Sequence, residues 1–199
     1  ALFKNGYLNG TVHTCVGQEL IGVFISKYLN ENDHIVSNHR GHGHYLSRFK
    51  DIKGLIGEVM GKAIGCSGGY GGSQHLVNNN YLSNGIQGGM VPIATGIGLY
   101  YRKSGIDAIS VAYIGDGTLG EGIIYESFNI ASNWGIPLLV VLENNQFAQS
   151  TSIKQSFSGN VQKRVEGFGL KYLSTSTNKI EDLEKKIMDA VEYVRKNNS

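Results

Sequence analysis

Two apolar runs, VAYIGDGTLGEG at residues 111–122 and LLVVLENN at residues 138–145, decide the fold of this chain. Each run is typical of a buried β-strand, expected over 108–114 and 138–142, and each ends in residues that strands disfavour. Between them, residues 120–134 carry apolar side chains at helical spacing. Strand, helix and strand in this order predict a parallel pair with a right-handed crossover. Near-continuous apolar strands further indicate an α/β fold, a parallel sheet with helices on both faces.

The polar residues that follow the two strands are expected to face one point. In a parallel pair both carboxyl ends lie at the same edge of the sheet, and neighbouring strands are about 4.8 Å apart. Asp116 directly follows the first strand, and Asn144 and Asn145 directly follow the second. A carboxylate, a carboxamide and a nearby main-chain carbonyl suit Mg²⁺ or Ca²⁺ and suit zinc poorly. Each motif alone is more simply an ordinary turn, but their shared position favours a metal site.

An anion is expected beside this metal. Gly117 to Glu121 is predicted to open the crossover helix, whose free N–H groups and dipole favour negative charge. The carboxyl edge of a parallel sheet is also where ligands of open α/β folds bind. A diphosphate bridged by the metal is therefore the ligand that the residues indicate.

The composition agrees with a small ligand held by loops. Glycine makes up 28 of 199 residues, about twice the usual share. The glycines cluster at 41–43, 65–72, 85–89, 96–98 and 115–122, which predicts loops that converge on a ligand. With 18 basic and 16 acidic residues the net charge is +2, and no polybasic run is present. This balance argues against nucleic acid or an anionic membrane as the partner.

The remaining composition indicates a cytoplasmic protein. Cys15 and Cys66 are too few for a disulfide framework, no apolar stretch is long enough to span a membrane, and no signal peptide is visible. The chain lacks a starting Met, opens in mid-element and stops just after a predicted helix. We therefore expect residues 1–199 to be a single domain from a trimmed or longer subunit, truncated at its C-terminus.

Further elements are predicted from periodicity and from turn signals. Helices are expected over 18–29 and 51–60, from the first turn at Pro92 to Arg102, and after a capping box at Asn178–Glu181. A short strand is expected over 34–37, running into a loop at 38–44. Residues 170–174 are expected to form another strand.

The motifs together resemble a known family. GDG at 115–117, followed after 26 residues by NN, resembles the thiamine-diphosphate motif. With its surroundings the chain resembles the α-subunit of the E1 component of 2-oxo acid dehydrogenases, including the pyruvate and acetoin enzymes. The resemblance covers essentially the whole chain and implies the PP-type fold, thiamine diphosphate and Mg²⁺. The further segments that carry it are HTCVGQE (13–19), HRGHGHYL (39–46), GGSQH (71–75) and NGIQGGMVPIATGIGL (84–99).

The resemblance implies a set of ligands for the metal and the diphosphate. Mg²⁺ would be held by the carboxylate of Asp116, the side chain of Asn145 and the main-chain carbonyl of Phe147. Gly117 and Thr118 would direct main-chain N–H groups to the diphosphate. The metal site expected from the strand ends and the family motif thus coincide.

The remaining cofactor contacts are also implied by the resemblance. Arg40 would contact the diphosphate, as suits a guanidinium fork. His39 stands where the family commonly has tyrosine, so its contact is expected to be sensitive to protonation. Gly85 and Gln87 match the segment whose backbone touches the aminopyrimidine ring, and Gly115 opens the diphosphate motif.

Two histidines are implied as catalytic. His13 matches a histidine near the reacting carbon, where it would bind substrate carboxylate or transfer a proton, and His42 would line the entrance with His44 and His75. Without the resemblance an isolated histidine is more often structural. His42 and His44 also resemble half of a zinc site, although no third ligand has suitable spacing. His34 is expected at the surface.

The implied function is that of a pyruvate- or acetoin-type dehydrogenase: oxidative decarboxylation of a 2-oxo acid such as pyruvate, or the oxidative cleavage of acetoin, with acyl transfer to a lipoyl group on an E2 partner. No pyrimidine-binding domain is visible in the sequence. The chain is thus expected to need a β-type subunit, in an α₂β₂ assembly, which supplies the glutamate that activates the cofactor. The family α-subunit also continues into a region with a catalytic histidine that is absent here.

Two alternatives stay open at this point. One is an acyl- or aldehyde-transferring enzyme of a biosynthetic pathway, such as half of a transketolase-like protein, which would share the cofactor and differ in its acceptor. The other is a non-catalytic subunit that keeps the cofactor pocket for assembly. Product analysis with different acceptors separates the first from a dehydrogenase, and turnover by the reconstituted pair excludes the second.

Overall fold

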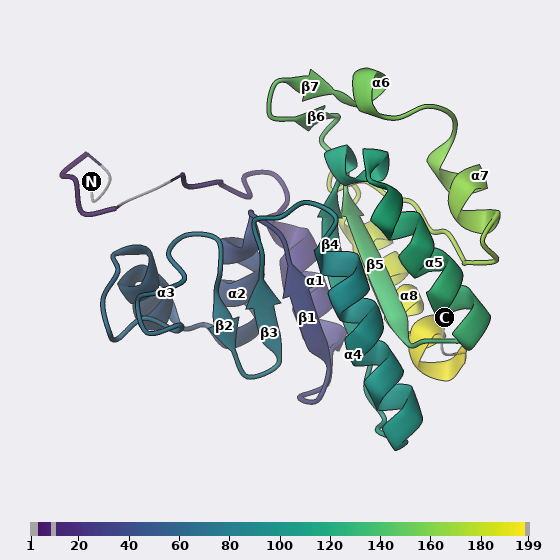
Figure 1. The fold of residues 1–199 in the computed structure, drawn as a ribbon, viewed down its shortest axis with the longest axis horizontal. Helices are drawn as coiled ribbons and strands as arrows, with labels where there is room; N and C mark the ends of the chain where they lie inside the picture. Colours follow the sequence, from purple (N-terminus) through teal and green to yellow (C-terminus); the bar gives the residue numbers. More distant parts are fainter. Residues whose placement is uncertain (1–3, 9–10, 198–199) are drawn as a thin grey trace.

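A five-stranded sheet in the order β2-β3-β1-β4-β5 forms the centre of the molecule (Figure 1). The computed structural model describes residues 4–8 and 11–197. Strands β3, β1, β4 and β5 are parallel, and β2 is antiparallel to β3. The strands are β1 (His34–Ser37), β2 (Val77–Asn78), β3 (Tyr81–Ser83), β4 (Ser110–Gly115) and β5 (Leu138–Glu143).

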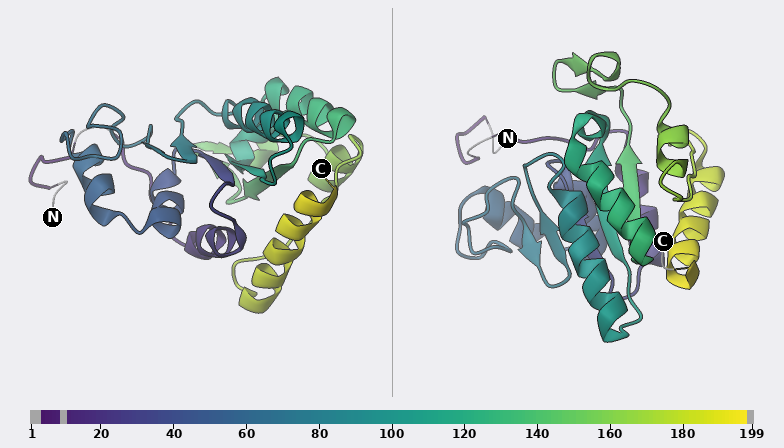
Figure 2. Two further views of the ribbon diagram at one scale, coloured as in Figure 1. Left: turned by 90° about the horizontal axis from the view of Figure 1, so that it is seen from below. Right: turned by 45° about the vertical axis from the view of Figure 1, so that its right-hand side comes forward.

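Helices cover both faces of the sheet, as the apolar strands predict (Figure 2). One face packs against α1 (Glu19–Tyr28), α2 (Gly41–Phe49), α3 (Ile52–Val59) and α8 (Ile180–Asn197). The other face packs against α4 (Met90–Ser104), α5 (Gly122–Trp134) and the short α7 (Val161–Glu166). Among the described helices, none has both the length and the apolarity that crossing a membrane requires.

The alternation of side chains along β4 explains why both faces are apolar. Val111 and Tyr113 point into the core beneath α1, α2 and α8, whereas Ala112 and Ile114 point into the core beneath α4 and α5. This period of two is the geometry of any strand. Because both sets are fully buried, the strand reads as a continuous apolar run.

The register between β4 and β5 fixes the position of the polar residues that follow them. Gly115 at the end of β4 lies beside Glu143 at the end of β5. Asp116 and Asn144 are therefore the next residues on two neighbouring parallel strands. The predicted arrangement of the two strand ends is confirmed.

Two stretches near these strand ends differ from the predicted elements. A loop was expected over residues 38–44, but α2 already begins at Gly41. His44 and Tyr45 are buried, and their packing against α1 and the sheet outweighs the weak helix propensity of Gly and His. After β4 the chain makes a 3₁₀ turn, η1 (Asp116–Gly120), and α5 begins only at Gly122. The prediction that Gly117 opens this helix is therefore wrong, and the dipole of α5 starts at Gly122.

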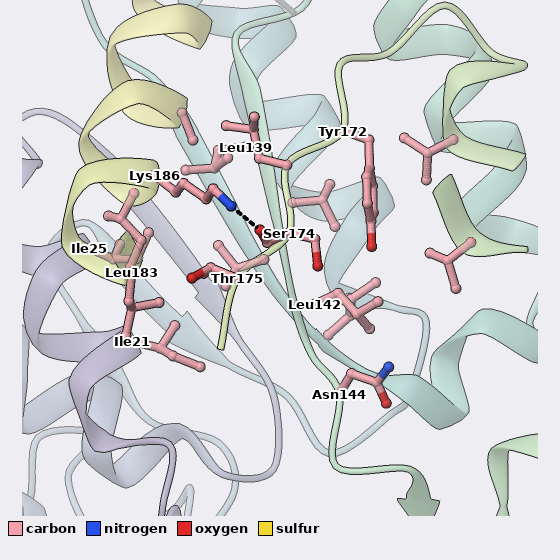
Figure 3. A pocket seen from close by; sticks show the side chains of 18 of the residues that line it. Ile21, Ile25, Leu139, Leu142, Asn144, Tyr172, Ser174, Thr175, Leu183 and Lys186 are labelled. Atoms are coloured by element: carbon pink, nitrogen blue, oxygen red, sulfur yellow. Dashed lines mark hydrogen bonds between the residues drawn. The ribbon is translucent and has the colours of Figure 1, made fainter. Parts of the chain in front are cut away.

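The C-terminal part also differs from the prediction. Residues 170–174 form no strand. They run partly exposed beside the outer edge of β5, with a cavity of about 860 Å³ between them and the strand (Figure 3). Lys186 instead donates a hydrogen bond from Nζ to the Ser174 carbonyl at 2.5 Å. Helix α8 begins at Ile180, two residues after Asn178, so the expected capping box does not form the first turn.

Candidate functional site

The carboxylate of Asp116 is the most unusual polar group at the strand ends. The residue is 1 % exposed, and among the described residues its Oδ2 has no hydrogen-bond partner. A buried polar atom without a partner is unfavourable, and a buried carboxylate more so. The local fold therefore supplies a negative oxygen whose natural partner is a cation.

The asparagine pair lies in an exposed turn beside this carboxylate. Asn145 Oδ1 accepts a hydrogen bond from the Phe147 amide at 2.9 Å, and Asn144 Oδ1 accepts one from the Gln146 amide at 3.1 Å. Gln146 has a φ of 70°, which lets the chain reverse after β5. These turns direct the chain back across the end of β4.

A small hairpin then brings Phe147 over the turn at Asp116. Its strands are β6 (Phe147–Ala148) and β7 (Thr151–Ser152), seen above β4 and β5 in Figure 1, and α6 (Ile153–Ser156) follows. A Cβ at Gly117 would lie 2.4 Å from the Ala148 Cβ, so this approach requires glycine. The fold thus brings together the segments that carry all three predicted metal ligands.

A chain of contacts joins four other predicted residues. The rings of His13 and His39 meet edge to face with centroids 4.7 Å apart. Gln87 Nε2 donates to His39 Nδ1 at 2.8 Å, and the Thr118 hydroxyl donates to Gln87 Oε1 at 3.2 Å. Residues from four separate segments therefore converge, through side chains, on the turn that follows β4.

His13 and His39, the two histidines in this series of contacts, are neutral near pH 7. Burial, reinforced by the charges of His13 and Arg40, lowers the pKa of His39 to about 4. Burial and the neighbouring Arg40 and His42 also lower the pKa of His13. The His39 imidazole therefore charges only in acid, so the protonation sensitivity expected of its contact falls at low pH and not near pH 7. A neutral imidazole offers one donor and one acceptor.

Arg40 and Gly85 are sequence neighbours of two residues in this series of contacts, His39 and Gln87. The Arg40 guanidinium donates to the Thr14 carbonyl, and the Arg40 amide donates to Asn38 Oδ1 at 2.8 Å. Gly85 follows β3, where a Cβ would lie 2.2 Å from Gln74 Oε1. Both residues sit in loops at the carboxyl ends of strands. Gly115 faces open space, since a Cβ added there would meet no atom within 4 Å.

The other histidines have structural surroundings. His42 Nε2 lies 2.7 Å from the Ser73 carbonyl, and burial lowers the pKa of His42. His44 contacts Glu143 instead of sharing a metal with His42, and in the described part of the chain no three His, Cys, Asp or Glu side chains form a metal cluster. The zinc alternative thus finds no support. His75 is exposed. His34 was expected at the surface but is half-buried.

The sequence reading missed a buried pair directly beneath the site. His44 Nε2 lies 3.0 Å from Glu143 Oε1, and both side chains are 2 % exposed. The pattern LLVVLE did contain a signal: Glu143 has the same parity as Leu139 and Val141, which face the core under α8. A carboxylate at an inward position of a strand demands a partner.

The cavity beside β5 only touches this site. Its body is apolar and lies between α1, the edge of β5 and α8, with Ile21, Leu139 and Leu183 among its walls (Figure 3). Arg40 and Asn144 are among its polar lining residues. The cavity does not include Asp116, so the candidate site is the set of loops at the strand ends and not the cavity.

Comparison with known proteins identifies the family of this chain. The model of the family described as dehydrogenase E1 component matches residues 1–199. The chain is 34% identical to the pyruvate dehydrogenase E1 component subunit alpha of Rickettsia bellii over 200 residues, covering 98% of this chain and 61% of that protein. It is 33% identical to the protein of the same name from Rhizobium meliloti, covering 98% of this chain and 57% of that one.

A third comparison extends over less of the chain. The mitochondrial somatic form of pyruvate dehydrogenase E1 component subunit alpha from Rattus norvegicus is 34% identical over 156 residues, 78% of this chain and 40% of that protein. The chain thus spans about three fifths, or less, of the length of these relatives. Since the family model matches every residue, the chain belongs to the dehydrogenase E1 component family.

Proposed function

We propose that this chain is the cofactor-binding part of an E1 α-type subunit that uses thiamine diphosphate and Mg²⁺ to decarboxylate a 2-oxo acid oxidatively. Pyruvate is the preferred substrate, because the relatives are named for pyruvate dehydrogenase. Acetoin remains the second substrate to test. The acyl group would pass to a lipoyl group of an E2 partner.

The observation that carries the proposal is the unpaired Asp116 oxygen at the carboxyl end of β4. Its buried position next to the Asn144–Asn145 turn suits a hard divalent cation. Asp116, Asn145 and the carbonyl of Phe147 would hold Mg²⁺. An oxygen set of this kind fits Mg²⁺ because it leaves positions open for phosphate oxygens.

Thiamine diphosphate supplies an electron sink for the decarboxylation. In this chain Gly115, Gly117, Thr118 and Arg40 would hold the diphosphate. The first N–H groups of η1 have no partner within the turn, and the guanidinium supplies a fork of donors. The site would therefore bind the anion through backbone and side chain together.

The series of side-chain contacts that joins His39, Gln87 and Thr118 would position the organic part of the cofactor. Gln87 is fixed between His39 and the Thr118 hydroxyl, and Gly85 precedes it in the same loop. His39 and His13 are neutral near pH 7 because burial lowers their pKa. We propose that His13 takes or gives a proton at the substrate, and that His42 orients the loop at the entrance.

A β-type partner is part of the proposal. The described residues supply ligands for the diphosphate end, and we assign the pyrimidine-binding domain to a second chain in an α₂β₂ assembly. We also keep a cytoplasmic location as a proposal. Relatives from bacteria favour it, whereas the rat relative is named mitochondrial; cell fractionation distinguishes the two.

Calorimetry tests the cofactor proposal directly. The full-length protein, purified with the chains that accompany it, is titrated with thiamine diphosphate in Mg²⁺ and again after chelation of the metal. We expect saturable binding that falls at least tenfold without Mg²⁺. Equal affinity in both titrations contradicts the proposed metal site.

The acceptor decides the class of reaction. The same preparation is given pyruvate or acetoin together with lipoamide, an artificial electron acceptor or an aldehyde. A dehydrogenase reduces lipoamide or the artificial acceptor, whereas a transferase forms a longer carbon chain from the aldehyde. Cofactor binding without turnover of any substrate identifies a non-catalytic subunit.

A further inference from the structure

The buried His44–Glu143 pair connects three strands at the edge of the sheet where the site lies. His44 Nδ1 lies 2.8 Å from the hydroxyl of Ser37, and its Nε2 lies 3.0 Å from Glu143 Oε1. The imidazole stacks on the ring of Tyr113 with centroids 3.7 Å apart and planes 16° apart. Asn38 Nδ2 donates to Glu143 Oε2 at 3.5 Å. The pair thus touches the ends of β1, β4 and β5.

These contacts stand at the base of the two loops that carry predicted ligands. Glu143 directly precedes Asn144 and Asn145, and Asn38 directly precedes His39 and Arg40. The strands β1 and β5 are not neighbours, because β4 lies between them. The loops therefore share no backbone ladder, and this side-chain bridge over Tyr113 is a direct connection between them.

We propose that His44 and Glu143 are positioning residues, which fix the loop after β1 relative to the loop after β5 so that both reach one diphosphate and its metal. The inference rests on the proposed function for the identity of the ligand. It does not make either residue a ligand, because both side chains are buried beneath the loops.

Stability alone does not account for a pair at this place. Deeper in the same core the corresponding positions of the strands are apolar, with Ile35, Val111 and Leu139 on the same face. Replacing both partners of a buried hydrogen bond by apolar groups of the same shape is often nearly neutral for stability. Hydrogen bonds, however, define the distance and orientation of the groups they join more strictly than apolar contacts do.

Three variants of the full-length protein, compared with a matched control, separate position from stability. His44→Phe keeps an aromatic ring on Tyr113 and removes both hydrogen bonds. Glu143→Gln keeps the shape and removes the charge. The double variant His44→Phe/Glu143→Leu removes both polar partners, so that neither is left unpaired.

The matched control is Arg195→Met, at the opposite edge of the sheet. Arg195 Nη2 donates to Asp33 Oδ2 at 2.6 Å, and Asp33 is fully buried just before β1. This variant leaves the buried Asp33 carboxylate without its arginine partner and does not touch the loops of the site. It therefore reports what a loss of stability alone does to cofactor binding.

Two readouts are measured for every variant beside the thermal midpoint. One is the Kd of thiamine diphosphate in saturating Mg²⁺. The other is the rate of amide hydrogen exchange at residues 38–41 and 144–147 in the cofactor-free protein. The second readout does not depend on the identity of the ligand.

We expect His44→Phe and the double variant to raise the Kd at least tenfold and to speed exchange in both loops, although the double variant recovers most of the thermal midpoint. Glu143→Gln should raise the Kd severalfold. Arg195→Met should lower the midpoint and change the Kd less than twofold. A double variant with wild-type Kd and wild-type loop exchange overturns the inference. Faster loop exchange in a protein that binds no thiamine diphosphate upholds the positioning and overturns the proposed ligand.

Discussion

Two glycine-rich segments, residues 65–72 and 115–122, look alike in sequence but differ in how each satisfies a buried carboxylate. In the first, Glu58 accepts hydrogen bonds from four backbone amides, at 2.7 Å from Ser67, 2.9 Å from Gly69, 2.6 Å from Gly71 and 3.2 Å from Gly72. In the second, Asp116 Oδ2 has no partner among the described residues.

The difference separates a structural loop from a binding loop. The first segment is complete, because its amides and its carboxylate satisfy one another. The second is incomplete until something binds. Glycine clustering alone therefore does not identify a ligand loop, because the glycines of residues 65–72 already serve the Glu58 carboxylate. That this cluster also reaches a ligand stays a prediction.

The largest effect that we predict is on ligand binding by Asp116→Ala. This change should weaken Mg²⁺-dependent binding of thiamine diphosphate at least 100-fold, because it removes the proposed anionic ligand of the metal. Thermal stability should hold or rise, since an unpaired buried carboxylate is lost. Calorimetry and a thermal melt of the full-length protein measure both. Binding at the wild-type level would place the metal elsewhere.

Glu58→Gln should show the opposite behaviour. An amide can accept at one oxygen only, and its NH₂ group would face two backbone donors, so we expect a loss of about 3 kcal/mol of unfolding free energy. Urea denaturation measures this loss, and calorimetry should give a cofactor Kd within threefold of the wild type. A selective loss of cofactor binding would make segment 65–72 part of the site.

A pair of glycine substitutions sharpens the same contrast. Gly65→Ala places a Cβ 2.4 Å from Glu58 Oε2 and 2.5 Å from the Glu58 Cα, so overpacking should cost about 2 kcal/mol of stability. Gly115→Ala meets nothing within 4 Å and should leave stability unchanged. Because the diphosphate is proposed to fill that space, the same Gly115→Ala variant should raise the cofactor Kd about tenfold. Melts and titrations of both variants decide the matter.

The smallest effect is on acid stability. Burial raises the pKa of Glu58, but four backbone N–H groups outweigh it and leave the pKa below its ordinary value. The stabilisation is therefore complete above the unfolded-state pKa of about 4.3 and is lost as pH falls through the lower folded value. Unfolding free energy measured from pH 6 to 3 should fall less steeply in Glu58→Gln. Parallel curves would exclude Glu58 as the titrating group.

The strands and the meeting of their ends could be predicted from the sequence because they depend on local patterns. The apolar run before Asp116 and the run before Asn144 each define a strand, and a parallel pair has one carboxyl edge. The 3₁₀ turn at Asp116 was not predictable from periodicity, since five residues are too few to show one.

Features that depend on distant contacts were missed. Helix α2 forms in a His- and Gly-rich segment because Tyr45 and His44 are buried against other elements. Residues 170–174 have strand-like composition, yet a cavity separates them from β5. The bond of His44 to Glu143 joins residues 99 positions apart, a distance that no sequence pattern reveals.

The most direct test of the metal site is a crystal structure of the full-length protein with thiamine diphosphate and Mn²⁺ in place of Mg²⁺. We predict one anomalous peak within about 2.2 Å of Asp116 Oδ2, with the Asn145 side chain and the Phe147 carbonyl among its other ligands. A peak that does not contact Asp116, with this carboxylate still unpaired, would contradict the account.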